Sequence, residues 1–219
     1  TATWTRDVGW HDAAVRPYAP FQMDPASAVL HYAQMIFEGL KAYRHADGSV
    51  WTFRPEANAA RFARSARRLA LPELTAEDFV GSIDALVQVD RDWVPGGEAS
   101  LYLRPFMFAS EVFLGVRPAR EVTYCLIASP AGSYFAQGVQ PVTIWLSEDY
   151  TRAAPGGTRE APCGGHSAAS LAGQREGSAP DGDQVADVDL RRLRLAARVG
   201  AVLRRPTRRL GGRRRRMCC

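Results

Sequence analysis

Two arginines in the first half of the chain are placed where they could bind anions. Arg61 lies on a helix that Pro55 is expected to open, and its guanidinium could donate to two phosphate oxygens at once. Arg104 shares one face of a predicted strand with Tyr102, since side chains alternate along a strand. A buried arginine needs a carboxylate, from the protein or from a ligand. The more ordinary alternatives are a solvated helix face for Arg61 and an internal salt bridge for Arg104.

The stretch 31–44, HYAQMIFEGLKAYR, contains the only lysine of the chain, Lys41. We predict a strand along this stretch, interrupted at Glu38 and Gly39. A glycine inside a strand often marks a place where another group approaches the backbone closely. Because Gly39 has no Cβ, a flat ligand could lie against the chain, with Phe37 on the same face by alternation. The alternative is a bulged strand packed in an ordinary core.

The surrounding pattern predicts a framework of helices and strands that would position these side chains. Residues 9–25 are expected to be extended and rich in turns. Asp47 and Gly48 predict a hairpin turn, and Thr75 is placed to cap a helix through Asp78. The further predicted strands are 50–53, 100–109, 121–129 and 141–147. Strands and helices that follow one another in this way favour the α+β class.

Composition narrows the class of protein. The chain has 219 residues, 46% of them hydrophobic, which fits a globular protein with a real core. No apolar run approaches the roughly 18 residues of a membrane helix, and the first residues lack the features of a signal peptide. The four cysteines show neither a CxxC pair nor metal-ligand spacing, so we predict reduced thiols and no metal site. We expect a cytoplasmic protein.

The end of the chain differs from the rest. Lys and Arg total 28 and the net charge is +5, with arginines crowded into residues 191–216. Every Trp, Tyr and Phe lies at or before Tyr150, so the last part lacks the large side chains that dominate burial. Clustered arginine is also typical of proteins that bind RNA or DNA, which gives an alternative function. That stretch has no interleaved aromatic residues for stacking on bases, and we treat such binding as incidental.

Three motifs in order carry a resemblance to a known family: FEGLKAYR, FRPEANAARFARSARRLALPEL and LYLRPFMFASE. They resemble the branched-chain amino acid aminotransferases, which are pyridoxal 5'-phosphate (PLP) enzymes of fold-type IV. The resemblance is continuous over residues 9–150 and weaker to about Gln184. A D-amino-acid aminotransferase or an aminodeoxychorismate lyase is the close alternative, and the stretch RPFMFASEVFLGV favours the branched-chain group.

The resemblance implies a D-amino-acid-aminotransferase-like fold and a homodimer. Its small α+β domain would span residues 1–134 and its linker 135–140. The beginning of the large PLP-binding domain would span 141–177, followed by an arginine-rich aberrant tail at 178–219. The implied reaction moves an amino group from leucine, isoleucine or valine to 2-oxoglutarate, which yields a branched 2-oxo acid and glutamate.

The resemblance also implies roles for single residues. Arg61 matches the arginine that binds the PLP phosphate, and Arg104 matches the residue that receives the side-chain carboxylate of 2-oxoglutarate or glutamate. The residues matched to the substrate pocket are Tyr32, Phe37, Gly39, Tyr102, Val116 and Tyr134. Tyr32 and Val116 would reach across from the partner subunit. For each aromatic residue taken singly, core packing is the ordinary alternative.

The sequence departs from the family pattern at residues 156–167, GGTREAPCGGHS, where the family resembles GGTGEAKCGGNY. Pro162 therefore occupies the position of the Schiff-base lysine, and Ser167 that of a tyrosine that contacts the cofactor ring. Proline has no amine, so no catalytic residue is assigned and we predict that this chain is inactive. Lys41 is the only substitute amine apart from the N-terminus, and a solvated lysine is its ordinary interpretation. We interpret the break as a reading-frame shift in a GC-rich gene.

Overall fold

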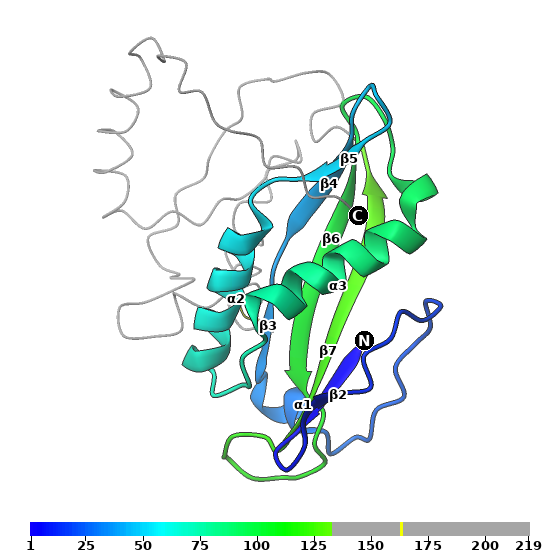
Figure 1. The fold of residues 1–219 in the computed structure, drawn as a ribbon. Coiled ribbons are helices and arrows are strands. Elements are labelled where there is room, and N and C mark those ends of the chain that lie inside the picture. The colour runs from blue at the N-terminus through cyan, green and yellow to red at the C-terminus, as the bar shows by residue number, and fades with distance from the viewer. Residues whose placement is uncertain (133–162, 164–219) are drawn as a thin grey trace, which may run out of the picture.

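The computed structural model of the chain describes residues 1–132 and Cys163, which form one sheet with helices on one side (Figure 1). The described elements are, in chain order, β1 (Ala2–Thr5), β2 (Gly9–His11), α1 (Ala28–Tyr32), β3 (Met35–Phe37), β4 (Leu40–Arg44), β5 (Val50–Thr52), α2 (Pro55–Arg68), α3 (Ala76–Val89), a 3-10 turn (Arg91–Trp93), β6 (Ser100–Ala109) and β7 (Glu121–Ala131). The strand order is β2-β1-β7-β6-β4-β5, with β3 also paired to β6. All these pairings are antiparallel.

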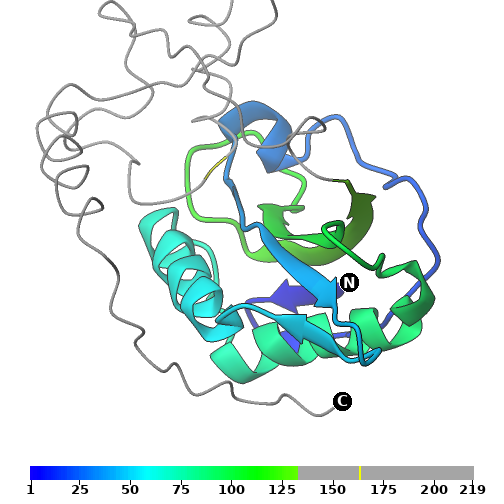
Figure 2. The same ribbon diagram turned by 90° about the horizontal axis from the view of Figure 1, so that it is seen from above.

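Helices α2 and α3 cover one face of this sheet. Seen from above, they lie next to one another along the same side (Figure 2), and the rings of Phe62 and Phe79 lie 5.3 Å apart between them. Beneath the helices, β6 contributes Leu101 and Leu103, both at most 1% exposed. Burying such side chains contributes roughly 1.5–3 kcal/mol each to stability. The core therefore lies between the two helices and one face of the sheet, and the other face of β6 stays available for a site.

The predicted α+β class is confirmed, and most predicted elements occur where expected. Helix α2 begins at Pro55, and Thr75 caps α3 by accepting a hydrogen bond from the Asp78 backbone N–H at 3.0 Å. Asp47 and Gly48 form the turn between β4 and β5, with Gly48 at a φ of 78°. The boundary predicted at residue 134 and the strand predicted at 141–147 lie outside the described residues.

Two sequence predictions need correction. His31 and Tyr32 are not in a strand; they end helix α1, which stops where Ala33 takes a left-handed φ of 50°. The N-terminal segment is more regular than expected, since β1 and β2 form a hairpin that adds to β7. These strands hold only four and three residues, which is too short for an alternating pattern to stand out in the sequence.

The interruption between β3 and β4 has a physical cause on the neighbouring strand. Phe37 lies opposite Phe106 and Leu40 opposite Leu103, so the two strands share one register. That register places Glu38 opposite Pro105, and the Glu38 N–H donates to the Pro105 carbonyl at 2.8 Å. Proline has no N–H to return the second bond of the pair. The hydrogen-bond ladder therefore breaks at Glu38, so Glu38 and Gly39 lie between β3 and β4 and can contribute to a site.

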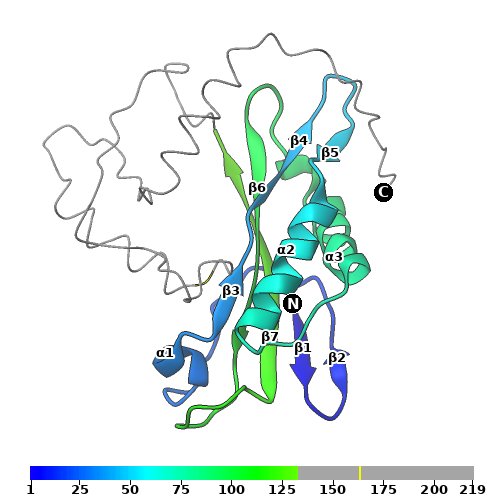
Figure 3. The ribbon, with the colours of Figure 1, turned by 90° about the vertical axis from the view of Figure 1, so that its left-hand side faces the viewer.

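At the α1 end of the sheet, loop 110–120 between β6 and β7 packs beside α1 (Figure 3). Glu111 holds this loop together, since its carboxylate accepts two bonds from Arg117, at 2.7 and 3.0 Å, and one from the Arg120 N–H at 2.6 Å. The Arg117 guanidinium in turn stacks 3.9 Å from the centre of the Phe113 ring. These bonds, led by those from Arg117, hold the pKa of Glu111 below its ordinary value.

We predict that Glu111→Gln lowers the stability of the chain at pH 7 but not at acid pH. A carboxylate with a lowered pKa stabilises the folded state above its unfolded pKa, about 4.3, and loses this effect as pH falls through the folded pKa. The measurement is urea unfolding at several pH values between 2 and 7. Glu98→Gln, at an exposed carboxylate, is the control. Equal losses for both variants at every pH would contradict the assignment.

Candidate active site

A carboxylate lies inside the helix-facing side of the sheet. Ile36, Glu38 and Leu40 alternate toward α2 and α3, and the Glu38 side chain is 0% exposed between these two apolar neighbours. A buried carboxylate is costly unless it is paired and hydrogen-bonded. The position of Glu38 therefore requires donors from the helix that packs above it.

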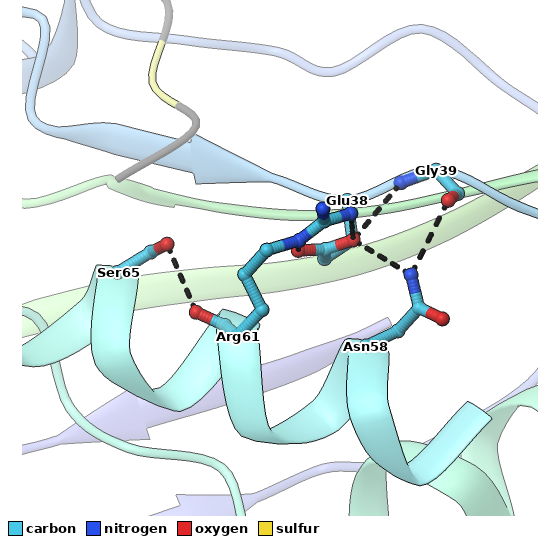
Figure 4. Close-up of polar contacts among 5 residues, drawn as sticks. All are labelled: Glu38, Gly39, Asn58, Arg61 and Ser65. Atoms are coloured by element: carbon cyan, nitrogen blue, oxygen red, sulfur yellow. Dashed lines mark hydrogen bonds and ion pairs between the residues drawn. The ribbon is translucent and has the colours of Figure 1, made fainter. Parts of the chain in front are cut away.

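Arg61 and Asn58 on α2 supply these donors (Figure 4). The Arg61 Nε donates to Glu38 Oε1 at 2.5 Å and its Nη2 to Oε2 at 2.6 Å, which makes a two-pronged pair. Asn58 Nδ2 donates to Oε2 at 2.9 Å, and the Gly39 N–H reaches the same oxygen at 3.4 Å. Every Glu38 carboxylate oxygen thus has a partner, and the carboxylate is fixed from three sides.

The helix presents these groups because of their spacing. Asn58, Arg61 and Ser65 recur at intervals of three and four residues, so they share one face of α2. Ser65 lies buried below them and donates to the Arg61 carbonyl at 3.0 Å. This polar face borders the apolar stripe of Ala59, Phe62 and Ala66 that holds the helix on the core. Helix packing and polar pairing therefore depend on neighbouring faces of the same stretch of α2.

Arg61 keeps a side open to solvent. Its side chain is 48% exposed, and the bonds with Glu38 raise its pKa above the ordinary value, so it stays charged at any physiological pH. Within residues 1–132 its Nη1 makes no hydrogen bond. A planar guanidinium held along one edge can donate from the other edge to an anion such as a phosphate. Arg61 is therefore not simply a solvated residue on a helix face, which was the ordinary alternative from the sequence.

The opposite face of the same strands carries a second guanidinium. Arg104 lies 4.7 Å from the ring centre of Phe37 and 5.3 Å from that of Tyr102. Its Nη2 and Nε donate to the Tyr102 hydroxyl at 2.6 and 3.2 Å. Two aromatic faces and one phenol oxygen thus hold a half-buried positive charge.

Arg104 has no carboxylate partner in the described part of the chain. The internal salt bridge considered from the sequence is therefore not found there. A neutral phenol oxygen offsets little of the charge of a half-buried guanidinium, so this face can accept a carboxylate. Lys41 lies across the ladder from Tyr102, on the same side of the sheet.

Gly39 permits the close approach predicted for it, but the approaching group is a side chain of the protein. A Cβ at Gly39 would lie less than 3.0 Å from the Tyr102 hydroxyl oxygen. The Tyr102 phenol thus occupies the space against the backbone that a flat ligand was expected to fill. Only a residue without a side chain fits at position 39 while Tyr102 supports Arg104.

The structure brings together four of the predicted substrate residues: Phe37, Gly39, Tyr102 and Arg104. Tyr32 and Val116 lie instead at the α1 end, where the rings of Tyr32 and Phe113 are 6.4 Å apart and Val116 is 91% exposed. Tyr134, Pro162 and Ser167 lie outside the described residues.

Glu38 and Asn58 were not identified as site residues from the sequence. The available signal was alternation, because Glu38 has the same parity as the buried Ile36 and Leu40. A charged residue at an inward position of a strand predicts a buried partner, and α2 offers Arg61 three residues after Asn58.

Cys163 adds a further contact beside this site, since it forms a β-bridge with Ile36.

Comparison with known proteins agrees with the motifs. No family model matches the chain. It is 60% identical over 191 residues to a probable branched-chain-amino-acid aminotransferase of Streptomyces coelicolor, with 86% of this chain and 53% of that protein covered. It is 56% identical over 201 residues to the branched-chain-amino-acid aminotransferase of Mycolicibacterium smegmatis, with 91% of this chain and 55% of that protein covered. The chain is a homologue of branched-chain-amino-acid aminotransferases.

The fold also matches solved structures. A branched-chain amino acid aminotransferase solved with pyridoxamine 5'-phosphate matches with a TM-score of 0.64 at 24% identity, over 87% of this chain and 60% of that one. The chain spans about half the length of the curated aminotransferases it matches. Because the Mycolicibacterium match takes in 91% of the chain, the similarity to these aminotransferases runs beyond Gln184, further than predicted. No described helix is long and apolar enough to cross a membrane.

We predict that Gly39→Ala destabilises the chain by about 1–3 kcal/mol, the usual range for overpacking. The new methyl group would force the Tyr102 phenol away and withdraw the oxygen that accepts from Arg104. Gly81→Ala, in α3, is the control because nothing lies within 4 Å of a Cβ there, and it should stabilise by roughly 0.5–1 kcal/mol.

Urea unfolding of both single variants measures this difference. Tyr102→Phe combined with Gly39→Ala removes the clashing oxygen, so the double variant should lose less than the sum of the two single losses. Unchanged stability of Gly39→Ala would show that Tyr102 does not need the open backbone at this position.

Proposed function

We propose that this chain forms the small-domain side of a branched-chain aminotransferase active site. The observation that carries the proposal is the Arg104 guanidinium, held between Phe37 and Tyr102 with no carboxylate from the described residues. Such a group receives the side-chain carboxylate of glutamate or 2-oxoglutarate. The apolar rings beside it would contact the branched side chain of leucine, isoleucine or valine.

The cofactor of the family, PLP, fits this chain only in part. A solved relative carries pyridoxamine 5'-phosphate, and Arg61 offers the free guanidinium edge that the phosphate of such a group needs. When bound, PLP supplies the electron sink for removal of the amino group. The attachment does not fit, because Pro162 stands where the family has the lysine that holds the cofactor and moves the proton. We therefore assign no proton-transfer step to this chain.

Four of the described residues each have a task in this proposal. Arg61 anchors a phosphate on the helix-facing side of the β3–β4 break, while Arg104 receives a carboxylate on the other side. Tyr102 orients Arg104 through its hydroxyl. Phe37 covers the guanidinium and limits its contact with water, which strengthens its attraction for a carboxylate.

The proposed assembly is a homodimer in the cytoplasm. Exposure of Tyr32 and Val116 at the α1 end supports a role in which they complete the pocket of a partner subunit. We place the small domain at 1–134, the linker at 135–140 and the start of the large PLP-binding domain at 141–177. The segment 178–219 forms the arginine-rich tail.

We predict that the purified chain has no aminotransferase activity, because it lacks an amine at Pro162. The measurement is formation of glutamate from leucine and 2-oxoglutarate in the presence of PLP. Any turnover would contradict the prediction, and turnover that survives Lys41→Ala would also exclude the only lysine side chain as the source of the amine.

Pro162→Lys alone should not restore activity. Ser167 is too short to replace the tyrosine of the family pattern, and positioning errors near 1 Å cost on the order of a hundredfold in rate. A variant whose residues after Gly157 follow the family pattern, extended to a full large domain, should be active in the same assay. Equal turnover by the two variants would show that the small domain contributes more of the site than proposed.

Sequencing of the encoding nucleic acid across codons 155–219 tests the frame-shift interpretation. A clean, unshifted reading would remove it.

We also predict salt-sensitive binding of RNA or DNA without sequence preference through residues 191–216, because arginine clusters displace counterions from phosphates. Filter binding at several salt concentrations measures it, with a variant lacking the stretch as control. An unchanged affinity and salt slope in that variant would exclude the arginine stretch as the cause. Such binding would be incidental to the aminotransferase site.

A further inference from the structure

We propose that Glu38 is the positioning residue of Arg61: it holds the guanidinium by one edge so that the other edge faces an incoming phosphate. The inference rests on the proposed function and adds a residue to it. Glu38 does not touch the phosphate in this arrangement; it acts through Arg61. The class of ligand is the phosphate ester of a pyridine cofactor.

Glu38 and Arg61 form a pair with a defined geometry. A guanidinium is planar and carries five N–H groups, and Glu38 accepts from the Nε and from one Nη2 hydrogen of Arg61. Two parallel bonds fix both the plane and its rotation, which a single bond would not do. The hydrogens of Nη1 then point away from Glu38 on a side chain that is 48% exposed. The free edge has a set direction before any ligand arrives.

Glu38 is itself held in place by its neighbours. Its side chain is fully buried, Asn58 donates to it at 2.9 Å, and its own N–H is bonded to the Pro105 carbonyl at 2.8 Å. Glu38, which holds Arg61, is therefore itself bonded to the central strand β6 through Pro105. The ion pair between Arg67 and Glu73 is different, because its side chains are 57% and 44% exposed and no such support is present among the described residues. That pair serves as a matched control near the end of the same helix.

The position and the charge of Glu38 have opposite effects on anion binding at Arg61. The negative charge of Glu38 opposes the binding of an anion at Arg61, whereas its geometry favours it. Glu38→Asp keeps the charge but withdraws the carboxylate by one methylene, so the two-pronged contact is lost. Glu38→Gln keeps the length but removes the charge and puts an amide N–H against an arginine N–H. If position dominates, Glu38→Asp weakens phosphate binding; if charge dominates, Glu38→Gln strengthens it and Glu38→Asp has little effect.

The experiment measures the dissociation constants of pyridoxine 5'-phosphate and pyridoxine for the full chain by equilibrium dialysis. Neither compound has an aldehyde, so neither reacts with Lys41. The dissociation constant of pyridoxine divided by that of pyridoxine 5'-phosphate gives the gain in affinity due to the phosphate. A purely structural effect of a mutation weakens both ligands alike and leaves this ratio unchanged. Arg61→Gln sets the value of the ratio without a guanidinium.

We expect Glu38→Asp to reduce the ratio about tenfold, the size of a lost charge-assisted hydrogen bond. Glu73→Asp should leave it unchanged. Asn58→Ala removes one support of the carboxylate without changing charge, and it should reduce the ratio about threefold. This variant decides the question if Glu38→Asp does not fold, as judged by its thermal unfolding.

Each outcome has one meaning. A ratio that falls in Glu38→Asp or Asn58→Ala and not in Glu73→Asp supports the inference. A ratio that is high in the unmutated chain and unchanged in both site variants overturns the inference and leaves the proposed function intact. A ratio near one in the unmutated chain shows that the phosphate adds nothing, and both the proposed cofactor role and this inference then fail.

Discussion

The buried carboxylate of Glu38 is the constraint on which the rest of the site depends. A strand that alternates toward a helix layer would normally place an apolar side chain at this position, between Ile36 and Leu40. The charge is tolerated because Arg61, Asn58 and the Gly39 N–H all reach it. Removing one partner of a buried pair commonly costs more than the pair contributes. The lateral position of α2 on the sheet is therefore fixed by Glu38 as well as by its apolar stripe.

The break between β3 and β4 gives two neighbouring residues opposite tasks. Glu38 points toward α2, and Gly39 leaves its outer side open to the Tyr102 phenol. Pro105 makes the break possible because it cannot return a ladder bond to Glu38. One dipeptide thus lies between a guanidinium on the helix-facing side and a guanidinium on the outer face. The separation of the proposed phosphate anchor from the proposed carboxylate receptor follows from strand alternation, which turns Glu38 toward Arg61 on α2 and Gly39 toward the outer face.

Sequence reasoning recovered the elements whose signals are local. Pro55, Thr75 and the Asp47–Gly48 turn each determine a boundary through their own backbone chemistry, and each occurs where predicted. Pairing across the sheet could not be predicted in the same way. The role of Pro105 depends on the residue opposite it, and the short β1–β2 hairpin depends on the free edge of β7. For Arg61 the sequence pattern favoured solvent, because its partner Glu38 lies 23 residues away in the chain.

The two arginines differ in how much of their charge is already offset. Arg61 faces a full carboxylate at two-pronged contact, so an anion at its free edge meets a nearly neutral pair and gains mainly from fixed direction. Arg104 faces only a phenol oxygen and two aromatic rings, so it retains more of its attraction for a carboxylate. A doubly charged phosphate binds well even where attraction is reduced, whereas a singly charged carboxylate needs the less compensated partner. The proposed assignment of phosphate to Arg61 and carboxylate to Arg104 therefore agrees with electrostatics as well as with position in the fold.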